Sequence, residues 1–287
     1  MLLRLIPFIA SLALFSVSNL AISQMIVGHR GASWDAPENT LAAFHLAWEQ
    51  EADGVEGDFY LTRDSKIVCF HDRTTKRTTG VDLRVEDATL AELRKLDAGR
   101  WKDPKWENER IPTFAEVLQA IRDGGTFVIE IKSDRRLVPH LKAELDRLDH
   151  SHIDLLIIGF DEHVIADCKR LLPDVKAHWL TGFKQNKTTK AWTPTADHIS
   201  KVVKRIGADG VGMHGKTQVI DTDFIATLKQ GGCDEFHVWT INSADDARYF
   251  ASLGAMGITT DRPAMIRAAV ESGDAVEARE AVGAAAQ

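Results

Sequence analysis

Short apolar segments alternate with helical patterns along almost the whole chain, and this alternation constrains the fold more than any other feature. Nine strand-like runs begin near residues 26, 54, 67, 127, 155, 177, 210, 236 and 257. Most are followed by a stretch with apolar residues three and four positions apart, which is the spacing of an amphipathic helix. Strands that alternate with helices favour a parallel sheet, because each helix returns the chain to the same edge of the sheet.

The number of strands predicts a closed (β/α)₈ TIM barrel. If residues 54–59 and 67–70 form one strand with a bend, eight strands remain, and 287 residues are enough for one such barrel. The alternative is that 67–70 is an independent strand and that the run near 177 is a loop. In either case we expect the chemistry at the carboxyl ends of the strands, as in other parallel barrels.

The first 23 residues differ in composition from the rest. Arg4 is followed by a mostly apolar stretch without further charge, and Ala21-Ile22-Ser23 offers small residues to a signal peptidase. We therefore expect residues 1–23 to be a signal peptide and the protein to be exported, either periplasmic or secreted. No stable membrane insertion is expected once the leader is cleaved. The alternative is an uncleaved membrane anchor.

The remaining chain divides into a barrel, a lobe and a tail. We expect the barrel domain to occupy residues 24–272. Residues 73–111 are polar and too many for an ordinary connection, so they predict a small inserted lobe after the second strand, over the mouth of the barrel. Residues 273–287 are rich in Ala and Glu and predict a flexible tail.

The charge and cysteine content exclude some classes of protein. A net charge of −7 argues against a nucleic-acid partner. The three cysteines, Cys69, Cys168 and Cys233, are too few and too scattered for a disulfide framework, and each has an apolar context typical of a small buried side chain. Nothing in the sequence indicates the oligomeric state.

Three acidic side chains interrupt otherwise apolar strands. Glu56 and Asp58 are two residues apart, so they share one face of a strand. Glu130 interrupts a later apolar strand in the same way. Carboxylates on a buried face repel each other and lose their hydration, and a bound cation would compensate for both effects. Three oxygen donors favour Ca²⁺ or Mg²⁺ as the cofactor over metals that prefer softer ligands.

Histidine and basic side chains occur at the ends of the same strands. His29 and Arg30 end the first strand-like run, and His71 ends the third. Because histidine titrates near neutral pH, His29 and His71 are candidates for a catalytic acid and base. Arg30 and Lys132 would bind a phosphate, Arg30 through two parallel guanidinium N–H bonds and Lys132 through its single ammonium charge. The alternative for Lys132 is a buried ion pair with Glu130, which by itself would stabilise the fold little.

These residues fall within short blocks that resemble the signature of the glycerophosphodiester phosphodiesterase family. The first five blocks are His29-Arg30-Gly31-Ala32, Pro37-Glu38-Asn39-Thr40, Glu56-x-Asp58, Thr62-x-Asp64 and His71-Asp72. Three later blocks are Glu130-x-Lys132, Trp239-Thr240-x-Asn242 and Thr260-Asp261-x-Pro263. The resemblance covers about residues 25 to 268. Five blocks in this order and spacing are far more specific than any one of them alone.

The resemblance implies metal-dependent hydrolysis of a small-molecule glycerophosphodiester to sn-glycerol 3-phosphate and an alcohol. It implies that His29 and His71 are the general base and acid, and that Glu56, Asp58 and Glu130 bind the metal. It also implies attack by the neighbouring glycerol hydroxyl through a cyclic phosphate. Trp239, at a strand end, would either form an apolar wall for the glycerol or pack in the core.

Two other functions and two local assignments stay open at this point. A lipid-directed phosphodiesterase would show an exposed apolar ridge at the barrel mouth, which the polar lobe does not suggest. A noncatalytic phosphoester-binding module would have lost a histidine or an acid of the site, and all are present. Asn39 either contacts the site or is the N-cap of the next helix, and Glu38 either contacts the site or favours the helix dipole.

Overall fold

The computed structural model describes residues 24–272. The predicted leader at 1–23 and the predicted tail at 273–287 therefore lie outside the described residues. Within residues 24–272, no helix is both long enough and apolar enough to cross a bilayer.

Strands and helices alternate through this region. The strands are β1 (Met25–His29), β2 (Gly54–Leu61), β3 (Ile67–Cys69), β4 (Thr126–Ile131), β5 (Asp154–Gly159), β6 (Lys176–Thr181), β7 (Lys184–Gln185), β8 (Trp192–Thr193), β9 (Gly210–His214), β10 (Glu235–Trp239) and β11 (Gly257–Thr260). The helices are α1 (Leu41–Glu49), α2 (Lys76–Thr79), α3 (Leu90–Leu93), α4 (Phe114–Gln119), α5 (Leu137–Arg147), α6 (Glu162–Leu171), α7 (Ala196–Ile206), α8 (Thr222–Gln230) and α9 (Ala244–Ser252), with the 3₁₀ turns η1 (Val85–Asp87) and η2 (Pro104–Trp106). A further helix covers 263–272.

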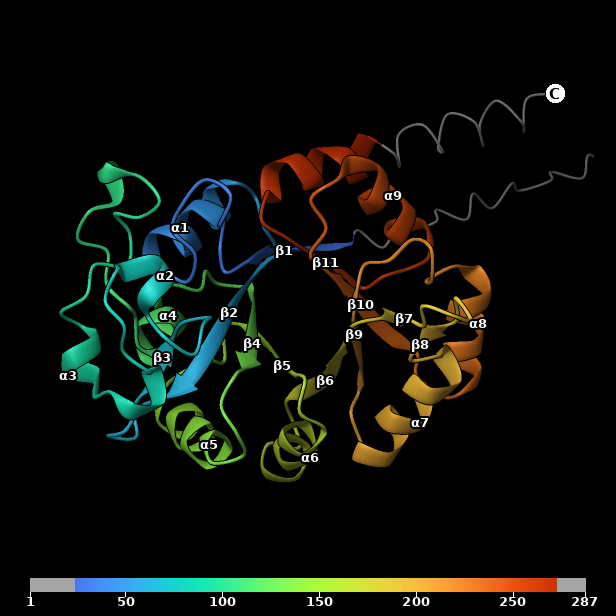
Figure 1. Cartoon of the computed structure of the whole chain (residues 1–287), viewed down its shortest axis with the longest axis horizontal. Coiled ribbons are helices and arrows are strands. Elements are labelled where there is room, and N and C mark those ends of the chain that lie inside the picture. The colour runs from blue at the N-terminus through green and yellow to red at the C-terminus, as the bar shows by residue number, and fades with distance from the viewer. Residues whose placement is uncertain (1–23, 273–287) are drawn as a thin grey trace, which may run out of the picture.

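Eight of the strands close into a parallel barrel. They pair in the order β1, β2, β4, β5, β6, β9, β10 and β11, and β11 pairs again with β1. Helices lie around the outside of this ring, as Figure 1 shows. The predicted (β/α)₈ TIM barrel is confirmed.

The expectation that residues 54–59 and 67–70 form one bent strand is wrong. β2 continues to Leu61, the chain turns, and β3 returns antiparallel beside it, with Phe59 opposite Cys69. A short turn can join only antiparallel neighbours, so β3 cannot belong to the parallel ring. The alternative was right that 67–70 is a separate strand and wrong about the run near 177, which forms β6. The return of β3 matters because it brings the chain back to the level of Asp58, whose carbonyl accepts the Phe70 N–H at 2.8 Å.

Side chains along the barrel strands alternate between the interior and the surrounding helices. Phe59 of β2 and Phe127 of β4 face outward and contact Phe114 of α4, with ring centroids 5.4 and 5.7 Å from that ring. Since the period of a strand is two, the acidic residues at the alternate positions face the barrel interior. These are Glu56 and Asp58 of β2 and Glu130 of β4. An apolar layer fills part of the interior with Val27, Val128, Leu156, Ile158 and Leu180.

The segment predicted as a lobe has a small core of its own. Short helices and turns make up this lobe, and its α3 begins with a capping box formed by Thr89 and Glu92. In Figure 1, α2 and α3 lie outside the ring, on the side of β2 and β3. The buried lobe side chains pack against Tyr60 of β2, Val68 of β3 and Phe70, and they are Val85, Ala88, Leu93, Leu96, Ala98 and Ile111.

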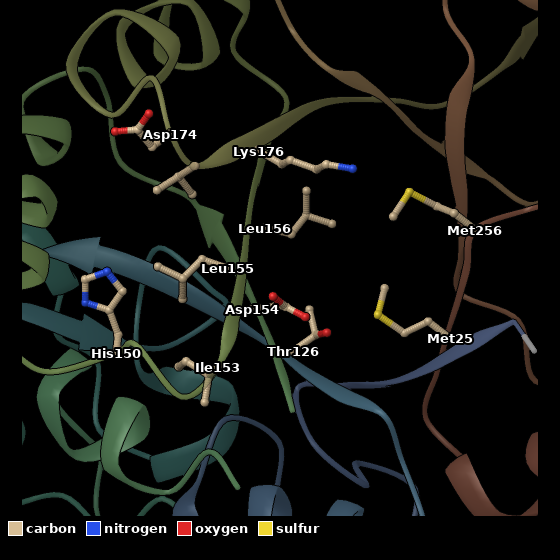
Figure 2. A pocket seen from close by; sticks show the side chains of 11 residues that line it. Met25, Thr126, His150, Ile153, Asp154, Leu155, Leu156, Asp174, Lys176 and Met256 are labelled. Carbon is tan, nitrogen blue, oxygen red and sulfur yellow. The ribbon is translucent and has the colours of Figure 1, made fainter. Parts of the chain in front are cut away.

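A hollow of about 590 Å³ opens at the amino ends of the barrel strands (Figure 2). Met25, Thr126, Asp154 and Lys176, which begin four of the strands, lie around it. The residues predicted to carry the chemistry do not line this hollow. Because parallel barrels carry their chemistry at the carboxyl ends of the strands, the candidate site lies at the other end.

One glycine of β9 makes room for an imidazole in the barrel interior. His237 and His178 stack there with ring centroids 5.3 Å apart. A Cβ at Gly212 would overlap the His237 ring and the Leu180 side chain.

We therefore expect Gly212→Ala to lower the free energy of unfolding by about 1–3 kcal/mol, because an added methyl group overpacks this interior. Gly182→Ala is the matched control, since a Cβ there meets nothing closer than 3.9 Å, and it should change stability by less than about 0.5 kcal/mol. Urea denaturation of both variants measures the difference. Equal stability of the two variants would show that the interior tolerates the methyl group.

Candidate active site

The three predicted acidic residues come together inside the mouth of the barrel. Glu56 and Asp58 lie on β2, and the parallel register places Asp58 beside Glu130 of β4. Each of the three offers one carboxylate oxygen, and these oxygens all lie within 4.8 Å of one another. Glu56 and Asp58 are each only 1% exposed. The two-residue strand period therefore puts Glu56 and Asp58 on one face of β2, and the pairing of β2 with β4 adds Glu130 to them.

Burial and mutual repulsion divide the charge unequally among the three carboxylates. Burial, reinforced by Asp58 and Glu130, raises the pKa of Glu56 well above its usual value. Burial and Asp58 also raise the pKa of Glu130 to about 7, although the Lys132 ammonium lies 2.8 Å away. Burial opposes the ionisation of Asp58 too, but Arg30 and Lys132 outweigh it and lower the pKa of that carboxyl. Asp58 is therefore the carboxylate that most readily keeps its charge.

Two oxygens of this cluster have no hydrogen-bond partner. Glu56 Oε1 and Asp58 Oδ1 are buried and accept no hydrogen bond within residues 24–272. An unpartnered buried acceptor is costly, and a divalent cation with oxygen ligands would satisfy both atoms. The donor set of three carboxylates therefore fits a hard divalent cation.

The two predicted phosphate-binding cations lie next to Asp58. The Arg30 guanidinium donates to Glu38 at 3.0 Å, and its Nε lies 3.2 Å from Asp58 Oδ2. Lys132 Nζ lies 3.4 Å from Asp58 Oδ1. Arg30 has a left-handed backbone with φ of 56°, and its N–H donates to Glu56 Oε2 at 2.9 Å. A strained backbone of this kind persists only where neighbouring groups hold it in place.

A carboxylate that sequence analysis left without a role holds His29. His29 Nδ1 lies 2.6 Å from Asp261 Oδ1, and Asp261 also accepts from Ser33 and Asn242. Burial alone would raise the pKa of Asp261, but the bond to His29 outweighs it and the pKa falls to about 2. Asp261 follows the last barrel strand directly, and that position at a carboxyl end was the signal that could have identified it.

A second carboxylate holds His71. His71 Nδ1 lies 2.7 Å from Asp72 Oδ1, and the Arg77 guanidinium of the lobe donates to both Asp72 and Glu38. The bonds from Arg77 in particular lower the pKa of Asp72 to about 2. Burial, aided by nearby cations, lowers the pKa of His71 although Asp58 opposes this shift. Nothing in the local sequence indicated that Arg77 would reach the site.

Asn39 supports the acidic cluster and is not the N-cap of α1. Thr40 caps that helix, because its side chain accepts from the Ala43 N–H. Asn39 instead donates from Nδ2 to Asp58 Oδ2 at 2.8 Å and accepts the Asp58 N–H at 3.2 Å. Of the two alternatives for Asn39, the contact with the site is right and the N-cap is wrong, because Thr40 occupies the capping position.

These groups surround an inner cavity of about 140 Å³. Trp239 lines the cavity wall together with Phe160, and the two rings meet edge to face at 5.5 Å. His237 also lines the cavity, whereas the sequence offered no role for it. Every predicted site residue except Asp58 lines the cavity: His29, Arg30, Glu56, His71, Glu130, Lys132 and Trp239.

The raised pKa of Glu130 predicts how the stability of the cation-free protein changes with pH. This pKa is about 7 in the folded protein against an ordinary 4.5, so between these values the folded state binds more protons and its stability falls as pH rises. In excess chelator we expect this group to remove about 2–3 kcal/mol of unfolding free energy between about pH 5 and pH 8. Glu130→Gln should lack that loss, and urea denaturation at both pH values measures it. Identical pH profiles for wild type and variant would contradict the assignment.

Comparison with known proteins places this chain in a family. The chain matches the model of the Glycerophosphoryl diester phosphodiesterase family over residues 29–265. A glycerophosphodiester phosphodiesterase from Caldanaerobacter subterraneus subsp. tengcongensis is 34% identical over 243 residues, which cover 83% of this chain and 94% of that protein. A glycerophosphodiester phosphodiesterase from Bacillus subtilis is 27% identical, with 83% and 84% covered.

A solved structure agrees with these matches. An Oleispira antarctica phosphodiesterase in complex with the product sn-glycerol-3-phosphate has a TM-score of 0.73 at 27% identity. The similarity covers 86% of this chain and 96% of that one. With the matched family model, the curated relatives and the barrel in agreement, this chain belongs to the glycerophosphoryl diester phosphodiesterase family.

Proposed function

We propose that this protein hydrolyses glycerophosphodiesters to sn-glycerol 3-phosphate and an alcohol with the help of a divalent cation, Ca²⁺ or Mg²⁺. The observation that carries the proposal is one cavity that combines a buried carboxylate cluster with two carboxylate-held imidazoles. The Oleispira antarctica relative, which was solved with sn-glycerol-3-phosphate as its product, supports the substrate class.

Charge neutralisation is the first requirement of this reaction. Arg30 and Lys132 both line the cavity, where their positive charges would bind the phosphoryl oxygens. Glu56, Asp58 and Glu130 would hold the cation, which supplies further positive charge to the same phosphoryl group. Lys132 Nζ donates to Glu130 at 2.8 Å, and both side chains line the cavity.

Proton transfer at both the attacking and the leaving oxygen is the second requirement. In each histidine a carboxylate bonds to Nδ1, which leaves Nε2 as the nitrogen free to exchange a proton. In the first step one imidazole takes the proton of the attacking glycerol hydroxyl, and the other gives a proton to the leaving alcohol. In the second step water opens the cyclic phosphate, and the two proton transfers run in reverse. Asp261 and Asp72 orient the rings and stabilise the imidazolium that forms in each half of the exchange.

A lipid-borne phosphodiester is a second candidate substrate. Among residues 24–272, the large apolar side chains that are exposed are Trp34, Val81, Trp101 and Phe160, and three of them lie at the barrel mouth. Arg262 covers the Trp34 ring, and Arg77 and Lys102 lie over Trp101. This surface is more polar than a continuous apolar ridge would be, which favours soluble diesters.

The deciding experiment follows glycerol 3-phosphate release from several soluble glycerophosphodiesters with Ca²⁺, with Mg²⁺ and with excess chelator. We expect release only with a cation and its loss in Glu56→Gln, which keeps the shape of the side chain and removes one metal ligand. Thermal unfolding gives a second readout, since the cation should stabilise the wild type and not the variant. Turnover of micellar lysophospholipid alone would favour the lipid-directed alternative.

Two substitutions test the proton-transfer assignment. His29→Ala and His71→Ala should each lower kcat by at least about 100-fold, because each removes an acid or base of the reaction. His150→Ala is a matched control, because His150 lies at the opposite end of the barrel. Circular dichroism should show all three variants folded. A folded His29→Ala or His71→Ala variant that keeps most of its activity would exclude that residue from proton transfer.

A further inference from the structure

A second hollow of about 420 Å³ adjoins the inner cavity on the side of the lobe. His29 and Arg30 line both spaces, so the two meet at groups assigned to proton transfer and phosphate binding. The other residues around this outer hollow are Ser33, Trp34, Glu38, Trp101, Lys102 and Asp261.

The sizes of the two spaces indicate which half of the substrate each space binds. The inner cavity, at about 140 Å³, is a third of the size of the outer hollow, and Phe160 and Trp239 form part of its wall. All substrates of the proposed reaction share a small glycerol phosphate and differ in the alcohol esterified to it. The inner cavity therefore suits the glycerol, and the larger, more open hollow suits the variable alcohol.

We propose that the outer hollow binds the alcohol head group and selects uncharged polyhydroxylated head groups over quaternary ammonium ones. This inference rests on the proposed hydrolysis of glycerophosphodiesters. It goes further by naming the substrate class and two residues, Trp34 and Lys102, that select it.

The aromatic rings of the hollow are poorly suited to a quaternary ammonium. Trp34 is 53% exposed and Trp101 is 39% exposed, so both offer indole surface to a ligand. Each ring already has a protein cation over it, and that positive charge repels a cationic ligand at the same ring. Arg262 Cζ lies 4.5 Å from the Trp34 centroid, and Lys102 Nζ lies 5.8 Å from that of Trp101. The remaining indole surface can still pack against the C–H groups of a polyol.

The charges around the hollow also favour a head group with hydroxyl groups over one with an ammonium. Both carboxylates are already engaged, because Glu38 accepts from two arginines and Asp261 from His29, Ser33 and Asn242. Lys102 Nζ donates to the Ser33 carbonyl at 2.7 Å. Among the described residues Lys102 has no carboxylate partner, so its charge would repel an ammonium. Its remaining N–H groups can donate to the oxygens of a polyol.

The test compares kcat/KM of the cation-loaded enzyme for glycerophosphoinositol and for glycerophosphocholine. The expected preference for the inositol diester is at least about tenfold. Lys102→Met should raise KM for the inositol diester by about tenfold with little change in kcat, since it removes a charged donor. The same variant should leave KM for the choline diester unchanged or lower it, because the repelling charge is gone. Trp34→Ala should also raise KM for the inositol diester.

Lys105→Met is the matched control. Lys105 lies on the same lobe with Nζ 5.0 Å from the Trp106 ring centroid, and it does not line the hollow. Its substitution should leave both sets of kinetic constants unchanged.

The outcomes separate this inference from the function on which it rests. If the wild-type enzyme has the same kcat/KM for the choline diester as for the inositol diester, the proposed selectivity is wrong and the proposed hydrolysis stands. If Lys102→Met affects both substrates equally, Lys102 does not select the head group. If the folded, cation-loaded protein hydrolyses neither diester nor any other glycerophosphodiester, the proposed function is wrong and the head-group inference falls with it.

Discussion

The arrangement at the barrel mouth depends on the burial of three carboxylates within 4.8 Å of one another. In a protein interior such groups repel strongly and lose hydration, so their neighbours must supply positive charge or hydrogen bonds. Arg30 and Lys132 lie on either side of Asp58, and Asn39 bonds to the same carboxylate. Two buried oxygens, Glu56 Oε1 and Asp58 Oδ1, still lack a hydrogen-bond partner among the described residues. This incomplete compensation leaves a set of oxygen donors that fits a divalent cation.

The buried carboxylates and the groups that surround them come from distant parts of the chain. β2 and β4 are neighbours in the barrel and supply the carboxylates, and the antiparallel return of β3 brings His71 beside them. The lobe is tied to the same network, because Arg77 bonds to both Glu38 and Asp72. The lobe therefore adds to the electrostatics of the cavity, and it also supplies one wall of the outer hollow through Trp101 and Lys102.

Features that depend on local spacing could be predicted, and features that depend on pairing between segments were predicted less well. The two-residue period placed Glu56 and Asp58 on one face of a strand, and the structure brings both into the acidic cluster. The direction of β3 was missed because an apolar run has the same composition whichever way it pairs. The role of Asn39 stayed open because its residue type suits an N-cap, while its contact with Asp58 depends on a strand nineteen residues away.

The sequence by itself determined the alternation of strands and helices, and hence the barrel, together with the residues at the ends of its strands. These follow from periodicity, which each segment carries locally. Only the tertiary structure decided which carboxylate holds each histidine: Asp72 is adjacent to His71, whereas Asp261 is 232 residues from His29. It also decided that Trp34 and Lys102 would share a hollow with the site. Such contacts depend on closure of the barrel and on the position of the lobe, which no local spacing encodes.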